Sequence, residues 1–227
     1  MIGGNVGIVT PISGESRKEI RSCLASVDCQ TSSRWHHLVI MDDVLHSPAW
    51  ADVNNYPHNE NRTIRQIVNN GQYGVYARQW ALGELLDEKY HCDYVCFLDG
   101  DNLIYPWYVE RAIQMLDRRM VRTRPNEDVP DRMNPIPAFC IMPILHCGPL
   151  PAGMVAPMVL QGEPVVGKID TLSVVSRLDI LRSAGGWDCS DPYYSDGKTY
   201  ERLAAYARSC GMVWVHPELV APMGIHR

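Results

Sequence analysis

The sequence predicts an α/β protein in which helices cover both faces of a mostly parallel central sheet. Three observations lead to this prediction. Short apolar runs typical of buried strands alternate with segments in which apolar residues recur at helical spacing. Two of these runs end directly on aspartates, as expected where strands of an open α/β sheet end at a functional edge. The length of 227 residues suits a single domain with a substantial core.

The first quarter of the chain sets the β-α-β order. Residues 6–10 form an apolar run that predicts a strand, and residues 38–41 and 63–68 predict two more. Ser16 is expected to open the intervening helix, because Glu19 stands three residues on, as in a capping box. The apolar face of this helix is formed by Ile20, Cys23, Leu24 and Val27.

The middle of the chain predicts two helices on either side of a strand at residues 94–98. The first spans residues 76–89, with an apolar stripe of Ala81, Leu82, Leu85 and Leu86. The second starts at Pro106, a residue suited to a first helical turn. Its stripe is Val109, Ala112, Ile113, Leu116 and Met120.

Residues 121–165 are expected to form a Pro-rich, loop-rich insertion within the single domain, since nine of the sixteen prolines fall there. Prolines also interrupt its apolar tract at residues 137–160, so we expect no transmembrane segment. A basic group adjoins the insertion: Arg118, Arg119, Arg122 and Arg124. A solvated face is the favoured interpretation of this group, and peripheral contact with anionic lipid is the alternative.

The last quarter returns to alternating elements. Residues 172–176 predict a strand and residues 178–183 a short helix, which Gly185-Gly186 stops. Ser195 is expected to cap a final helix, and residues 212–215 predict the last strand. The apolar face of the final helix is Tyr200, Leu203, Ala204 and Ala207.

Composition narrows the class of partner and the compartment. Apolar residues make up 46% of the chain and charged residues 21%, and the net charge of −5 gives no reason to expect a nucleic acid partner. The eight cysteines show no paired Cys-x-x-Cys spacing, and no apolar leader opens the chain. A cytoplasmic location is the simpler expectation, and a lumenal enzyme with disulfides is the alternative.

The most informative motif is Asp99-Gly100-Asp101, which follows the apolar run at residues 94–98. Residues two apart in an extended segment project the same way, so both carboxylates are expected on one face. Hard oxygen donors of this kind suit Mn²⁺ or Mg²⁺, and a divalent ion at this edge could neutralise a departing diphosphate. The motif alone is also common in ordinary surface loops.

Several segments resemble, in the same order, the GT-A nucleotide-sugar glycosyltransferases, family 2 in particular. They are residues 6–11, Gln30-Thr31, residues 39–43, Asn70-Gly71 with residues 76–79, residues 97–102 and residues 185–188. Gln79 stands where that family commonly has asparagine. The resemblance spans nearly the whole chain and implies a single GT-A domain. Residues 1–102 would form its nucleotide-sugar-binding half and residues 103–227 its acceptor-binding half.

The resemblance implies metal-dependent, inverting transfer of a sugar from a nucleoside diphosphate, with UDP favoured, to a hydroxyl of a glycan, lipid-linked or protein acceptor. The donor-binding residues would be Thr10, Pro11, Asp42, Arg78 and Asp99. Asp101 and His226 would hold Mn²⁺ or Mg²⁺. The physical interpretation agrees for Arg78, because a guanidinium matches a diphosphate by bidentate hydrogen bonding. Plainer interpretations remain: Arg78 and His226 as solvated side chains, and Asp42 and Asp43 as turn residues.

An inverting transferase needs a carboxylate base for the acceptor hydroxyl, and Asp196 is the candidate. It resembles the family's catalytic carboxylate at the start of the acceptor-side helix, although Ser195 precedes it where that family often has glutamate. It could instead complement the helix dipole, in which case Asp188 and Asp191 are the alternatives.

Acceptor binding is assigned to Trp187 and Asp188. Trp187, together with Tyr193 and Tyr194, could form an aromatic wall for a sugar ring. The opposing interpretation of Trp187 is a core residue, because tryptophan is usually mostly buried.

Three other functions remain open. Asp-x-Asp after a strand also serves metal-dependent phosphohydrolases, although their motif normally follows the first strand. A nucleotidyltransferase is disfavoured, because no Gly-rich loop with a basic residue follows the first strand. A non-catalytic nucleotide-binding domain of the same fold is the third alternative.

Overall fold

The computed structural model describes residues 4–42, 48–67, 74–86, 88–117, 135–148, 157–160, 162–217 and 221–227. Several features singled out from the sequence lie outside these ranges: Asp43, Val68 at the end of a predicted strand, Asn70-Gly71, Met120 and the arginines at 118, 119, 122 and 124.

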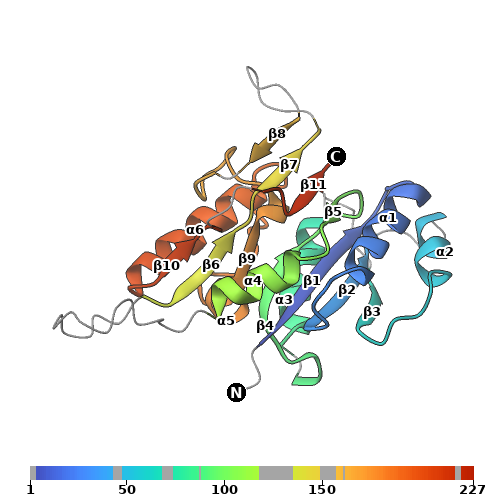
Figure 1. Ribbon diagram of the computed structural model, residues 1–227, viewed down its shortest axis with the longest axis horizontal. Coiled ribbons are helices and arrows are strands. Elements are labelled where there is room, and N and C mark those ends of the chain that lie inside the picture. The colour runs from blue at the N-terminus through green and yellow to red at the C-terminus, as the bar shows by residue number, and fades with distance from the viewer. Residues whose placement is uncertain are drawn as a thin grey trace.

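The centre of the molecule is a seven-stranded sheet (Figure 1). Its order is β10 (Val213–Val215), β6 (Pro137–Ile141), β9 (Val174–Arg177), β4 (Cys92–Phe97), β1 (Asn5–Ile12), β2 (Trp35–Met41) and β3 (Arg62–Gln66). Neighbouring strands pair in parallel, except that β9 runs antiparallel to both β4 and β6. The predicted mostly parallel sheet is confirmed.

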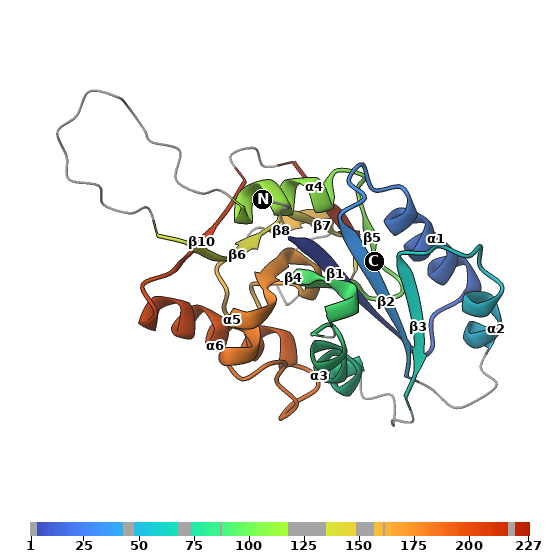
Figure 2. The same ribbon diagram turned by 90° about the horizontal axis from the view of Figure 1, so that it is seen from below.

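Helices cover both faces of this sheet, as Figure 2 shows in a view from below. One face carries α1 (Arg17–Asp28), α2 (Pro48–Asn54) and α4 (Tyr108–Leu116). The other carries α3 (Val75–Glu84), α5 (Leu178–Ser183) and α6 (Ser195–Ser209). Two short 3₁₀ helices, η2 (Glu88–Tyr90) and η3 (Thr171–Ser173), precede β4 and β9. The alternation of elements along the sequence therefore produces the layered architecture that it predicts.

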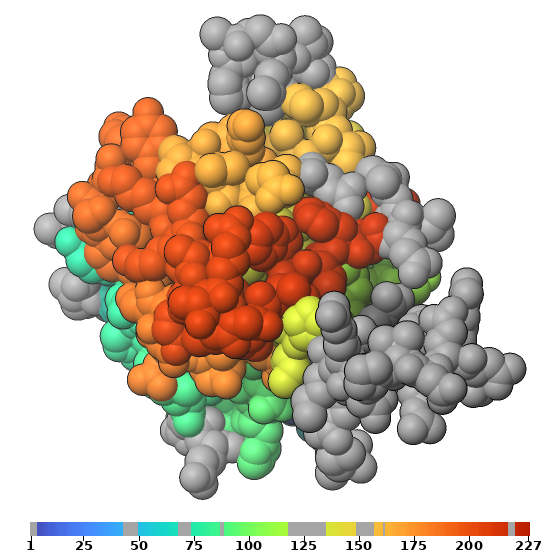
Figure 3. Space-filling view, turned by 90° about the vertical axis from the view of Figure 1, so that its left-hand side faces the viewer, coloured from blue at the N-terminus to red at the C-terminus, as the bar shows by residue number. Residues whose placement is uncertain are grey.

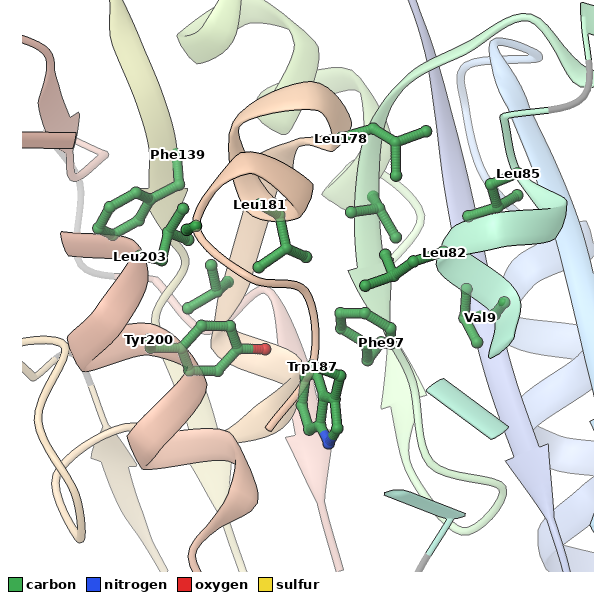
Figure 4. Packing of buried hydrophobic residues seen from close by; sticks show 14 of the residues in the cluster. Val9, Leu82, Leu85, Phe97, Phe139, Leu178, Leu181, Trp187, Tyr200 and Leu203 are labelled. Carbon is green, nitrogen blue, oxygen red and sulfur yellow. The ribbon is translucent and has the colours of Figure 1, made fainter. Parts of the chain in front are cut away.

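Alternate residues of the central strands point to opposite faces of the sheet. The buried residues form one cluster on the α3, α5 and α6 side and two on the α1, α2 and α4 side. Figure 4 shows the core on the α3, α5 and α6 side, where Trp187, Phe97 and Tyr200 lie together. The predicted apolar faces of α1 and α6 are buried as expected. Ser16 and Glu19 form the predicted capping box, since each side chain accepts a hydrogen bond from the other residue's backbone N–H.

A second, four-stranded sheet has the order β5 (Leu103–Ile104), β11 (Gly224–His226), β7 (Ile144–His146) and β8 (Met158–Leu160). β11 runs antiparallel to β5, with Ile225 opposite Leu103, and parallel to β7, with His226 opposite His146. Figure 3 shows the orange and red C-terminal segments spread over one side of the molecule. This small sheet was not predicted, and it brings the C-terminal residues beside the segment that follows Asp101.

Three local expectations are corrected. The helix after residue 76 ends at Glu84, which leaves Leu86 39% exposed rather than on the buried stripe. Ser195 is the first residue of α6 and not its cap, which is Tyr194; the hydroxyl of Ser195 donates to the carbonyl of Pro192. The segment expected to be loop-rich contains β6, β7 and β8, and β6 is buried throughout. Pro137 does not prevent this, because proline is tolerated at the first position of a strand.

Two further observations concern membrane-spanning helices and the cysteines. Within the described residues, no helix combines the length and apolar character needed to cross a membrane. All eight cysteines are free thiols.

Candidate active site

The carboxyl ends of β1, β2 and β4 share one edge of the central sheet, because these strands are mutually parallel. Asp42 follows β2 directly and is buried, with its backbone N–H donating to the carbonyl of Ile12 at 2.9 Å. Asp99 follows β4 after a single buried leucine, and its side chain is 25% exposed. The two strand-end aspartates of the sequence therefore face one edge, where ligands of open α/β sheets bind.

Arg78 is the cation of this edge. It lies in the first turn of α3, is only 5% exposed, and forms an ion pair with Asp99. Its guanidinium also lies 5.1 Å from the centre of the Trp187 ring. The helix starts after Gly74, whose φ of 70° favours glycine; a Cβ there would come within 2.7 Å of Pro11. Arg78 is thus a buried, paired residue, and the solvated interpretation is wrong.

Two further carboxylates, those of Glu15 and Asp101, lie near Asp99. A Cβ placed on Gly100 would lie 3.1 Å from the carboxyl carbon of Glu15, so the missing side chain makes room for that group. Burial raises the pKa of Asp101, and the charge of Asp99 raises it further. Burial also raises the pKa of Glu15, and the negative charges of Asp99 and Asp101 raise it further. Glu15 was not singled out from the sequence.

His226 reaches the same edge through β11. The backbone N–H of Arg227 donates to the side-chain carbonyl of Asn102 at 3.1 Å, which fixes the C-terminal strand beside the Asp-x-Asp segment. His226 Nδ1 pairs with Asp170 Oδ2 at 2.6 Å. Burial alone would lower the pKa of His226, but the hydrogen bond and charge of Asp170, with Asp99 and Asp101, raise it to about 9. His226 is therefore not simply a solvated terminal histidine.

Asp196 lies in the first turn of α6 and is partly buried. Its carboxylate interacts electrostatically with Arg78, Asp99 and Asp170. Its carboxylate accepts the N–H of Gly197 at 2.7 Å and the hydroxyl of Thr171 at 3.5 Å. Burial raises its pKa, the contact with Gly197 opposes this, and the charge of Asp170 adds to it. A carboxylate with a raised pKa is a better proton acceptor, which suits a general base.

Several predicted site residues are engaged in the core or in local turns. Thr10 is fully buried, and its hydroxyl lies 2.9 Å from His37 Nε2. Asp188 binds the backbone and hydroxyl of Ser190 and lies 3.2 Å from Arg202. Burial would raise the pKa of Asp188, but these partners lower it. Asp188 is therefore poorly suited to be a base, and it stabilises its own loop.

The aromatic residues divide between core and surface. Trp187 is 3% exposed and packs 4.5 Å from Phe97, centre to centre, so its ring is a core residue (Figure 4). Tyr193 and Tyr194 are 74% and 53% exposed on the loop before Asp196. An aromatic wall for a sugar ring is therefore better placed on these two tyrosines than on Trp187.

The residue types at this edge are ones that a hard divalent cation takes as ligands. Among the described residues, however, the three side chains whose ligand atoms lie within 4.8 Å of one another are His146, Asp170 and His226. Glu15, Asp99 and Asp101 bring carboxylate charge together, and Arg78 forms an ion pair with Asp99. Asp101 has carboxylate oxygens, and because Nδ1 of His226 contacts Asp170, Nε2 is the ring nitrogen that an ion would use. Carboxylate oxygens with one imidazole are ligands that Mn²⁺ accepts.

Three residues near the site escaped sequence reasoning: Glu15, His146 and Asp170. Asp170 is 7% exposed and accepts the backbone N–H of Leu172, so it begins η3 as a cap. None belongs to a recognisable motif. The only available signal was the rarity of buried charged residues, and burial at these positions could not be inferred from a loop-like sequence.

The raised pKa of His226 predicts a pH dependence of stability. The folded protein holds a proton at His226 that the unfolded chain releases near pH 6.5, so this stabilisation is complete below about 6.5 and is lost as pH rises through about 9. At about 1.4 kcal/mol per pKa unit, the free energy of unfolding should fall by on the order of 3 to 4 kcal/mol over that window. Urea denaturation of metal-free protein at several pH values measures it. Asp170→Asn should flatten this part of the profile, and an equally steep decline in that variant would contradict the assignment.

Comparison with known proteins identifies structural relatives only. No family model matches the sequence, and no curated protein matches it. A fragment of S. aureus TarS, residues 1–349, superimposes with a TM-score of 0.67 at 14% identity, over 97% of this chain and 60% of that one. The same fragment in complex with UDP-GlcNAc gives a TM-score of 0.66 at 12% identity, over 98% of this chain and 58% of that one.

A third solved structure is the mannosyltransferase PcManGT from Pyrobaculum calidifontis, in complex with GDP-Man and Mn²⁺. Its TM-score is 0.62 at 15% identity, over 99% of this chain and 57% of that one. The chain thus spans about three fifths of these solved chains. At such low identity the likeness shows a common fold, which is the resemblance expected from the ordered sequence segments.

Proposed function

We propose that this chain, which has the GT-A fold of nucleotide-sugar glycosyltransferases, is a metal-dependent inverting glycosyltransferase. One observation carries the proposal: an ion pair between the buried Arg78 and the partly exposed Asp99 stands at the carboxyl edge of the sheet, electrostatically coupled to Asp196 and adjoining Asp101. A cation for the diphosphate, oxygen donors for a metal and a candidate base are thereby close together.

Donor binding is assigned to the edge formed by β1, β2 and β4. Asp42 and Pro11 would face the nucleoside, Asp99 the ribose, and Arg78 would place its positive charge beside the diphosphate. The hydroxyl of Thr10 is bonded within the core, so it would contribute through the backbone shape of β1. TarS has been solved with UDP and UDP-GlcNAc and PcManGT with GDP-Man, which supports a nucleoside diphosphate sugar as the donor class. UDP remains the favoured nucleotide of the donor.

Catalysis is assigned to Asp196. In an inverting transfer the acceptor hydroxyl attacks the anomeric carbon on the face opposite the leaving diphosphate, and Asp196 would take the hydroxyl proton as that bond forms. Arg78 would stabilise the charge developing on the diphosphate. Asp101 and His226 would hold Mn²⁺ or Mg²⁺, and the bound ion supplies further neutralisation of that charge. Tyr193 and Tyr194 are suited to pack against the acceptor.

The phosphohydrolase alternative is disfavoured by the contacts of Asp99. An aspartyl nucleophile must present a carboxylate oxygen to a phosphoryl group, whereas Asp99 is held by the Arg78 guanidinium. Phosphatase activity on a generic phosphoester without a sugar nucleotide would revive that alternative.

The donor class can be tested by thermal shift with UDP, GDP, CDP and dTDP sugars, each with and without Mn²⁺. A ligand at about a hundred times its dissociation constant stabilises the folded state by about 2.7 kcal/mol, which corresponds to a rise of about 5–10 °C in Tm for a domain of this size. We expect one base to give such a rise only when Mn²⁺ is present. Equal shifts without the ion would contradict the metal assignment, and no shift with any donor would contradict the proposed function.

A further inference from the structure

His146, Asp170 and His226 form a cluster behind the proposed metal ligand. The two histidines come from neighbouring strands of the small sheet, where they stand opposite each other in register. Asp170 comes from the segment that enters η3, and both it and His146 are 7% exposed. One potential ligand atom from each of the three side chains lies within 4.8 Å of those of the other two.

Two histidines with one carboxylate could form a chelate for a transition metal, but the arrangement of the rings argues against it. His226 Nδ1 is already bonded to Asp170 Oδ2 at 2.6 Å. The two imidazoles are stacked, with centres 4.2 Å apart and planes only 11° from parallel. A coordinated ion lies close to the plane of each imidazole ligand, and two nearly parallel planes share no such position between them. The cluster therefore does not converge on an ion.

We infer that Asp170 and His146 are positioning residues for His226, an inference that rests on the proposed metal-dependent function. Asp170 accepts from Nδ1, which directs Nε2 to the ion as in carboxylate–histidine–metal arrangements. The stacked ring of His146 fixes the plane of the His226 ring. The role of His146 thus depends on its flat face and not on its nitrogens.

The segment that carries Asp170 is itself rigidly anchored. The hydroxyl of Tyr200 donates to the carbonyl of Thr171 at 2.9 Å, and that of Tyr108 donates to the carbonyl of Leu172 at 2.8 Å. Both tyrosines are fully buried core residues. Thr171 in turn donates to Asp196 at 3.5 Å, so one anchored segment contacts both the proposed metal ligand and the proposed base.

The experiment measures Mn²⁺ affinity by electron paramagnetic resonance in four variants and wild type. Asp170→Asn keeps the shape of the side chain but removes its charge, and we expect Mn²⁺ binding to weaken at least about tenfold, as for other outer partners of ligating histidines. His146→Ala should weaken binding as well. His146→Phe, which keeps a flat ring without nitrogens, should bind Mn²⁺ within about twofold of wild type. Asp179→Asn, an exposed aspartate on α5, is the matched control and should change nothing.

The outcomes separate this inference from the proposed function. Binding by Asp170→Asn equal to wild type would overturn the inference alone. Loss of binding in His146→Phe as complete as in His146→Ala would also overturn it, because His146 would then be a ligand. A wild-type protein that binds no Mn²⁺ would overturn the proposed metal dependence and this inference together. Should Asp170→Asn fail to fold, as judged by circular dichroism, the two His146 variants still decide the question.

Discussion

Asp196→Asn should slow sugar transfer strongly while leaving donor binding intact. A positioned general base contributes about 10²–10⁴-fold to a rate, and we expect kcat to fall by that amount. The amide can still accept the N–H of Gly197, so the start of α6 should keep its shape. Asparagine cannot take up the acceptor proton, however. Transfer is measured with the donor that the thermal screen identifies, and donor affinity by calorimetry.

Asp191→Asn provides a matched control on the loop that precedes α6. Asp191 accepts the backbone N–H of Tyr193 and pairs with Lys198 at 3.4 Å, so it has local partners and no assigned role in the chemistry. Its variant should transfer at close to the wild-type rate. If Asp191→Asn lost transfer and Asp196→Asn kept it, the base would be reassigned to Asp191.

Asp101→Ala should remove metal-stimulated transfer without destabilising the metal-free fold. A bound divalent ion supplies several kcal/mol of charge stabilisation, so its loss should slow transfer by about 10²–10³-fold. The carboxylate costs the metal-free protein stability, because burial and the charge of Asp99 raise its pKa. We therefore expect the metal-free variant to unfold at the same urea concentration as wild type, or at a higher one.

Mn²⁺ affinity completes this prediction. Asp101→Ala should bind the ion at least about tenfold more weakly, whereas Asp179→Asn should bind it normally. A variant at Asp101 that retained full Mn²⁺-stimulated transfer would exclude this residue as a ligand. Equal loss of transfer with normal Mn²⁺ binding would instead place Asp101 at the substrate.

Most elements of the fold could be predicted because their patterns are local. Ser16 and Glu19 indicate the start of a helix, because the two residues of a capping box are only three positions apart. The alternation of apolar runs with helical stripes predicts a layered sheet. Segment 121–165 was harder, because prolines indicate loops whereas β6 is stabilised by pairing with two distant strands. Long-range pairing of that kind leaves no trace in local spacing.

The candidate site was predicted in part for the same reason. Asp42 and Asp99 are visible in the sequence, because they follow directly on buried strands. Glu15 and Asp170 are not, since their proximity to the site depends on a missing Cβ at Gly100 and on the route of the chain into η3. Thr10 and Trp187 were assigned from the resemblance, and the structure places both side chains in the core.

The sequence alone determined the class of fold, the edge of the sheet that carries the aspartates and the polarity of the main helices, because these depend on periodicity and on direct neighbours along the chain. Only the tertiary structure decided which charges meet. Arg78 reaches Asp99 from another element, and β11 brings His226 to Asp101 from the far end of the chain. Side chains more than a hundred residues apart become neighbours only when strands pair. Their pKa values, and the strength of the electrostatic interactions between them, depend on the burial that this pairing creates.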